Sequence, residues 1–176
     1  AHAPVAAVHN GRLYHTGFQD KRGGVNILDA LSHEEIYHGL GHIRGMHSFD
    51  NKLIINIPGG IYDVFNKSHI NKRDSYTSCI HNERLIDSTR TDYYDTLTSV
   101  KLPYFYGPAY QMCSYFNQLV TIQHVLSDGK FAGKKIYMNS NQLNLLRADN
   151  ISALCSHNGN LLDGGSYNAI FDTLND

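Results

Sequence analysis

The chain has 176 residues, and its 15 Lys and Arg residues nearly balance its 16 Asp and Glu residues, so the formal net charge is −1. A balanced charge provides no field that attracts nucleic acid, and the sequence contains no apolar run of about 18 residues that could insert into a membrane. We therefore expect no nucleic-acid partner and no membrane insertion. A chain of this length can bury about 70% of its unfolded surface, which predicts a single globular domain over residues 1–176. Because the chain begins with Ala1 instead of Met, we expect this domain to be excised from a larger polypeptide.

Strand-sized segments follow one another along the chain, separated by short turn signals such as "HNG" at 9–11 and "DGG" at 163–165. These segments are rich in β-branched and aromatic residues, which favours strands. Leu53 and Ile55 share one face, and Pro58-Gly59-Gly60 then turns the chain, so 52–65 is predicted to be a hairpin. No internal repeat of fixed period is evident. The strand-sized segments are 12–18, 52–57, 61–65, 75–80, 97–106, 119–126 and 134–139.

Two short helices are expected among these strands. Ser32 and Glu35 have the spacing of a capping box, which predicts a helix over 32–38. The segment 109–118 is a second candidate, although its aromatic residues fit a strand as well as a helix. The predicted fold is therefore mainly β, an antiparallel sandwich or a curved sheet closed by one or two short helices.

The stretch "SHEEIYHGLGHIRGMH" at 32–47 holds four histidines and two glutamates. Zinc hydrolases place two histidines four positions apart on a helix with a glutamate between them, but His33 and His38 are five positions apart. His38 and His42 have the right spacing, yet Gly39 and Gly41 disfavour a helix there. We therefore predict no metal site and no cofactor. The alternatives are a metal site that joins His38 and His42 to a distant carboxylate, or a pH-sensitive surface.

The three cysteines allow at most one disulfide bond and exclude paired zinc motifs. Cys79 lies two positions before His81, and Cys155 two positions before His157. A cysteine nucleophile needs such a neighbouring base, but this spacing also arises by chance in strands that are rich in histidine. No GxSxG nucleophile elbow is present.

Tyrosines gather between 100 and 116, where two prolines interrupt the strand pattern. Tyrosine and other polar residues on loops are typical of binding surfaces, so Tyr104, Tyr106 and Tyr110 are the predicted ligand contacts.

We therefore predict a non-enzymatic recognition head of the viral, phage or adhesin type. Such a head would bind a host-cell glycan or surface protein through its loops, outside the cell or on a virion. The alternative is a secreted hydrolase or toxin domain that uses the His33–His47 cluster with a distant Asp.

Overall fold

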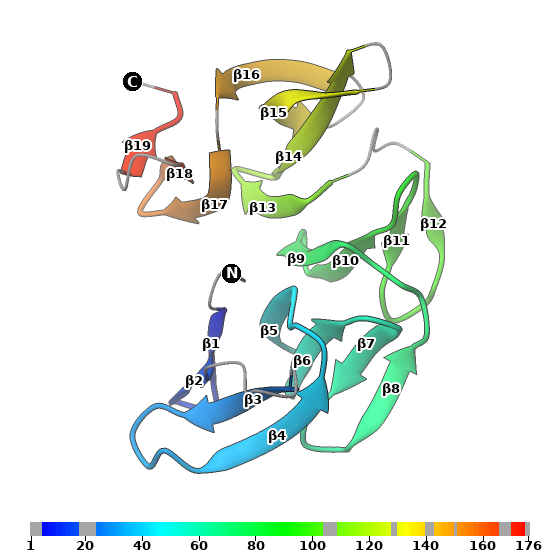
Figure 1. Cartoon of the computed structure of the whole chain (residues 1–176), viewed down its shortest axis with the longest axis vertical. Coiled ribbons are helices and arrows are strands. Elements are labelled where there is room, and N and C mark those ends of the chain that lie inside the picture. The colour runs from blue at the N-terminus through cyan, green and yellow to red at the C-terminus, as the bar shows by residue number, and fades with distance from the viewer. Residues whose placement is uncertain are drawn as a thin grey trace. The chain divides into compact units, whose positions relative to one another are not determined.

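The computed structural model describes residues 5–17, 24–103, 109–127, 130–139, 143–149, 151–165 and 170–174. The chain divides into two compact units, Ala1–Ser75 and Tyr76–Asp176. The prediction of a mainly β fold is confirmed, because the described residues form nineteen strands. None of the described residues lies in a helix, and so none lies in one that could span a membrane. Figure 1 shows the strands grouped into small sheets that follow one another in chain order.

The first unit contains two four-stranded antiparallel sheets, which we call blades 1 and 2. In each blade, every strand pairs with the strand that precedes it in sequence, so the sheet is a simple meander. Blade 1 consists of β1 (Ala6–His9), β2 (Arg12–Thr16), β3 (Gly24–Asp29) and β4 (Glu35–Leu40), and blade 2 of β5 (Gly45–Phe49), β6 (Lys52–Ile57), β7 (Gly60–Asp63) and β8 (Ser68–Asn71).

The second unit contains three further meanders, blades 3 to 5. Blade 3 consists of β9 (Thr77–His81), β10 (Arg84–Ser88), β11 (Tyr93–Asp95) and β12 (Lys101–Leu102). Blade 4 consists of β13 (Gln111–Tyr115), β14 (Gln118–Ser127), β15 (Lys130–Asn139) and β16 (Leu143–Asp149). Blade 5 has three described strands, β17 (Ile151–His157), β18 (Asn160–Gly165) and β19 (Ile170–Asp172).

The same two-residue turn joins the first two strands of every blade. Both central residues of each turn have a positive φ, between 42° and 78°. This conformation defines the type I′ hairpin, whose twist matches the twist of the flanking strands. The blades therefore form a repeat whose length varies, which agrees with the lack of a repeat of fixed period in the sequence. The five turns are Asn10–Gly11, Asp50–Asn51, Asn82–Glu83, Phe116–Asn117 and Asn158–Gly159.

An aspartate ends the third strand of four blades and shapes the turn that follows. The Asp29 carboxylate accepts hydrogen bonds from the backbone N–H groups of Leu31 and Ser32, at 2.9 and 3.0 Å. These bonds favour the charged form and hold the pKa of Asp29 below its ordinary value. The equivalent carboxylates of Asp63, Asp95 and Asp172 accept backbone N–H groups in the same way.

Adjacent blades within a unit pack against each other and bury most of the core. A leucine at the second position of the second strand marks this packing, because Leu53, Leu119 and Leu161 are at most 1% exposed and belong to the clusters that join adjacent blades. In unit 1, Tyr14 and Ile27 of blade 1 share a cluster with Leu53 of blade 2. In unit 2, one cluster joins blade 3 to blade 4, and another joins blade 4 to blade 5.

The predicted sandwich is wrong, because the described strands form five small sheets instead of two large facing ones. The strands are short and joined by tight turns, so each sheet is complete within a few tens of residues, and adjacent sheets within a unit pack against each other. The hairpin predicted over 52–65 is confirmed as β6 and β7.

Both predicted helices are wrong. The segment 32–38 forms a turn and the start of β4, and the Glu35 carboxylate accepts a hydrogen bond from Asn26 Nδ2 on the neighbouring strand (2.9 Å). The turn is held by Asp29, so Ser32 does not cap a helix there. Within 109–118, residues 111–115 form β13, whose partner is β14.

Candidate binding site

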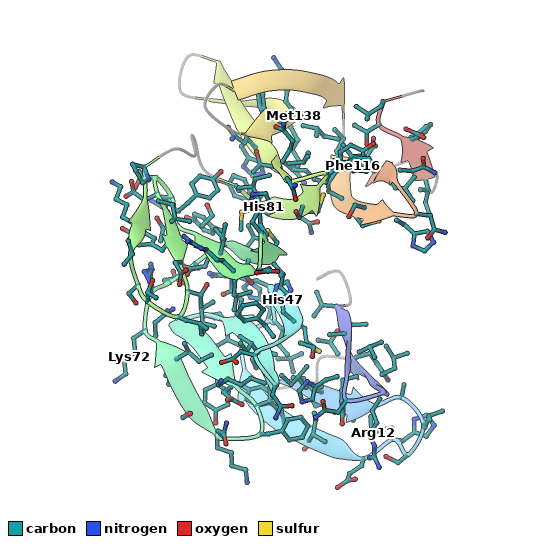
Figure 2. The ribbon with its side chains drawn as sticks, turned by 180° about the vertical axis from the view of Figure 1, so that it is seen from behind. Arg12, His47, Lys72, His81, Phe116 and Met138 are labelled. Atoms are coloured by element: carbon teal, nitrogen blue, oxygen red, sulfur yellow. The ribbon has the colours of Figure 1, made fainter. Side chains whose placement is uncertain are left out.

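The hairpin tip between β13 and β14 presents Phe116 to solvent. This side chain is 72% exposed, and it is labelled in Figure 2 at the end of its hairpin. Its φ of 42° lies in the left-handed region, which bulky residues rarely adopt. Four of the five equivalent hairpins place Asn or Asp at this turn position. A strained backbone at an exposed aromatic residue points to a function, because folding alone does not favour it.

The hairpin tip between β17 and β18 lies beside Phe116. The Tyr115 hydroxyl donates a hydrogen bond to the Gly159 carbonyl oxygen (3.0 Å), which ties the two hairpins together. The Tyr115 ring meets the Phe116 ring edge-on, with the centroids 4.6 Å apart. This contact packs the exposed ring of Phe116 against Tyr115.

A shallow pocket of about 180 Å³ opens between the two tips. Seven residues line it: Ser114, Tyr115, Phe116, Ser156, His157, Asn158 and Gly159. Pockets for drug-sized ligands usually have volumes of about 300 Å³ or more, so this pocket suits one inserted side chain. Its lining contains no carboxylate, Lys or Arg. Aromatic faces with hydroxyl, imidazole and amide groups can hold an apolar side chain and hydrogen-bond the backbone beside it.

A histidine and a serine form a hydrogen bond behind this pocket. His81 Nδ1 lies 2.9 Å from Ser114 Oγ, and both ends of the bond belong to first strands of adjacent blades, β9 and β13. Burial lowers the pKa of His81, because the charged imidazole loses its hydration. His9 and Ser48 make the equivalent bond between blades 1 and 2, at 2.8 Å. Because the pair recurs at the same blade position, its role is to join blades.

Of the two cysteine and histidine pairs noted in the sequence, Cys79 with His81 does not form an activated thiol, because Cys79 is buried. Burial raises the pKa of Cys79 and brings the pKa of Cys113 to about 12, which opposes thiolate formation. Cys155 is exposed, and none of the three cysteines forms a disulfide bond.

The structure describes one of the three tyrosines predicted to contact a ligand. Tyr104 and Tyr106 lie outside the described residues. Tyr110 is half-buried, and its ring stacks on those of Tyr76 and His124, with centroid distances of 5.4 and 3.5 Å. Its part in ligand binding stays a prediction.

The histidines of 33–47 do not gather at one point. His38 lies on β4, 3.6 Å from the Glu35 carboxylate, and His42 Nε2 accepts a hydrogen bond from Arg44 Nε at 3.2 Å. Among the residues with described coordinates, no group of three His, Cys, Asp or Glu side chains could hold a metal ion.

Sequence reasoning missed Phe116 and the pocket beside it. The signal was present, because "YFNQL" at 115–119 aligns with "HNGRL" at 9–13 and "HNGNL" at 157–161. In this alignment, Phe116 stands where the other two hairpins have the turn-forming residues Asn10 and Asn158.

Comparison with known proteins supports the fold but assigns the chain to no family. No family model matches the chain, and no curated protein matches it either. Solved structures do match. The RRP9 WD40 repeats are 14% identical, with a TM-score of 0.53 over 92% of this chain and 59% of that chain. BamB from Moraxella catarrhalis is 9% identical, with a TM-score of 0.53 over 91% of this chain and 57% of its own.

A third structure is a complex of KlAtg21 with the coiled coil of AgAtg16. It is 10% identical, with a TM-score of 0.56 over 95% of this chain and 64% of that chain. The chain thus spans less than two thirds of each of these three structures. At such identities the similarity concerns the fold alone. The five meanders are therefore blades of the β-propeller type.

Proposed function

We propose that this chain is a protein-binding scaffold that captures an extended segment of its partner at the two hairpin tips of blades 4 and 5. Propellers carry their binding residues on the loops and turns that a rigid array of blades holds in place. The KlAtg21 structure contains a protein partner, a coiled coil of AgAtg16, which is consistent with a protein ligand for this fold. The glycan and host-cell partners expected from the sequence stay predictions.

The carrying observation is the exposed ring of Phe116, whose backbone has a left-handed φ, beside a pocket the size of one side chain. An exposed aromatic ring that its neighbours hold in place loses little entropy on binding, and aromatic residues are frequent hot spots at interfaces. His157 and Asn158 add hydrogen-bonding groups beside the ring. The alternative of a hydrolase that uses the His33–His47 cluster receives no support from the described residues, since no group of three His, Cys, Asp or Glu side chains among them could hold a metal ion.

The test is a selection of random peptides displayed on phage against the whole chain, followed by affinity measurements on the enriched peptides. Phe116→Asn should weaken their binding about tenfold or more, as expected for a central aromatic contact. The same substitution should raise the melting temperature, because Asn tolerates the left-handed conformation better than Phe. Loss of binding together with a gain in stability separates a contact residue from a structural one.

Leu97→Asn is the matched control, because Leu97 is also an exposed apolar residue of the same unit but lies in the turn after β11. It should leave peptide binding unchanged. Enriched peptides that bind the Phe116→Asn variant as tightly as the original chain would overturn the proposal, and so would a selection that enriches no peptide.

A further inference from the structure

Two tyrosines stack on each other where blades 3 and 4 begin, within the second unit. Tyr76 and Tyr110 each precede the first strand of their blade, and their ring centroids lie 5.4 Å apart with an interplanar angle of 24°. His124 of β14 also stacks on Tyr110, with the centroids 3.5 Å apart and an angle of 15°. Two rings this close would overlap on one face, so Tyr76 and His124 cover opposite faces of Tyr110. We call these three rings the Tyr–His stack.

A buried serine fixes the backbone of both tyrosines. The Tyr76 N–H donates a hydrogen bond to the Ser88 carbonyl oxygen (2.7 Å). The N–H of Ala109, the residue before Tyr110, donates to the Ser88 hydroxyl oxygen (3.3 Å). Ser88 and Ala109 are both completely buried. The Tyr–His stack is therefore anchored to blades 3 and 4 in advance, and a ligand that binds it pays little for ordering the site.

The fold itself does not require aromatic residues at these positions. Val5 and Arg44 stand immediately before the first strands of blades 1 and 2, where blades 3 and 4 have Tyr76 and Tyr110. Both tyrosines are half-buried, so part of each side chain faces solvent. Their pairing is thus a particular feature of blades 3 and 4.

The stacking determines which chemistry the surface can recognise. Cations and nucleobases bind to the face of an aromatic ring, but both faces of Tyr110 are covered by its neighbours. The edge of an aromatic ring is its positive part, and a phenol hydroxyl can donate a hydrogen bond. A surface that presents ring edges and hydroxyl groups therefore suits an anion.

Arg90 supplies a positive charge beside the Tyr–His stack. Arg90 is exposed, and its Nε donates a hydrogen bond to the Tyr76 hydroxyl oxygen. This bond uses one of the five N–H donors of a guanidinium group, whose planar fork matches a carboxylate. Burial and the charge of Lys134 lower the pKa of His124, so the positive charge of this surface does not come from the imidazole at pH 7.

The two carboxylates closest in sequence to Arg90 have other partners. Asp92 forms an ion pair with Lys101. Asp87 is completely buried, and its carboxylate accepts a hydrogen bond from Thr96 Oγ1 at 2.9 Å. Neither carboxylate is therefore an unpaired negative charge that would repel an anionic ligand.

We propose that the edge of the Tyr–His stack, together with Arg90, binds a carboxylate side chain in an acidic segment of a protein partner. The formal net charge of the chain is −1, so an acidic segment is held by local groups and not by the charge of the whole chain. Tyr110 and Phe116 flank opposite ends of β13, which separates them by about 20 Å in an extended strand. This surface is thus distinct from the pocket beside Phe116, and either can fail alone.

The experiment measures the affinity of the whole chain for a fluorescein-labelled polyglutamate peptide by fluorescence anisotropy at low salt. A glycine-serine peptide of the same length is the uncharged comparison. Polyglutamate should bind more tightly, and added salt should weaken its binding because it screens exposed charges. Arg90→Gln should weaken binding about tenfold or more, since it removes a hydrogen bond between charged groups. Tyr110→Phe keeps the stacked ring but removes the hydroxyl, and should weaken binding about two- to tenfold. Thermal melting checks that both variants remain folded.

Arg84→Gln is the matched control, because Arg84 is an exposed arginine at the far end of β10 from Arg90. It changes the net charge by the same amount and should leave polyglutamate binding unchanged. Equal losses from Arg84→Gln and Arg90→Gln would show nonspecific attraction and overturn the proposal. Polyglutamate that binds no better than the glycine-serine peptide overturns it as well. Binding that Phe116→Asn abolishes would place the acidic segment in the pocket beside Phe116, which overturns this inference but supports the proposed function.

Discussion

Leu119→Ala and Leu13→Ala form a matched pair that tests the equivalence of the blades. Both residues occupy the second position of a second strand, but Leu119 is 1% exposed and Leu13 is 45% exposed. Leu119 packs with Cys79, Ile86 and Tyr93, so its truncation removes apolar contacts and leaves a cavity. A buried Leu→Ala substitution costs about 2–5 kcal/mol. The partly solvated Leu13 has less apolar surface to lose, and we expect a cost below about 1 kcal/mol.

The assay is urea unfolding at a concentration low enough to keep the chain monomeric. Circular dichroism and tyrosine fluorescence serve as two probes, since the chain has 12 Tyr and no Trp. Coincident transitions allow the free energy of unfolding to be extrapolated to water. If Leu13→Ala costs as much as Leu119→Ala, then Leu13 packs in the folded chain as Leu119 does, and equivalent positions of the blades contribute equally to stability.

Three further outcomes follow from the structure. Burial lowers the pKa of His81 in the folded chain, so the unfolded state binds more protons in acid; the free energy of unfolding should fall as the pH drops below about 6.5. His81→Gln should flatten this dependence of the free energy of unfolding on pH, as measured by urea unfolding. An unchanged slope would mean that other groups cause the dependence. Iodoacetamide should label Cys155 alone in the dilute native chain, because Cys79 and Cys113 are buried with raised pKa values, and rapid labelling of three thiols in mass spectra would contradict this. Gly159→Ala should lower the free energy of unfolding by about 1–2 kcal/mol, because its φ of +78° disfavours a residue with Cβ; a neutral effect in urea unfolding would mean that the turn relaxes.

The sequence by itself determined that the fold is mainly β, and it located several of the turns. The apolar residues Leu53, Ile54 and Ile55 and the Pro58-Gly59-Gly60 turn predicted a hairpin that the structure contains. These signals are local, because side-chain alternation and turn conformation depend on residues that are close in sequence. The capping-box spacing of Ser32 and Glu35 was misleading for the same reason: it is a local preference, and the pairing of β3 with β4 overrides it.

Only the tertiary structure decided which faces are covered. Leu13 and Leu119 occupy the same position of the repeat and have the same side chain, yet one is exposed and the other is buried. The pocket beside Phe116 likewise needs two hairpins whose tips are 42 positions apart in sequence, at 116 and 158. Burial at these positions depends on the neighbouring blade and not on the residue itself, so the pattern of one strand cannot reveal it.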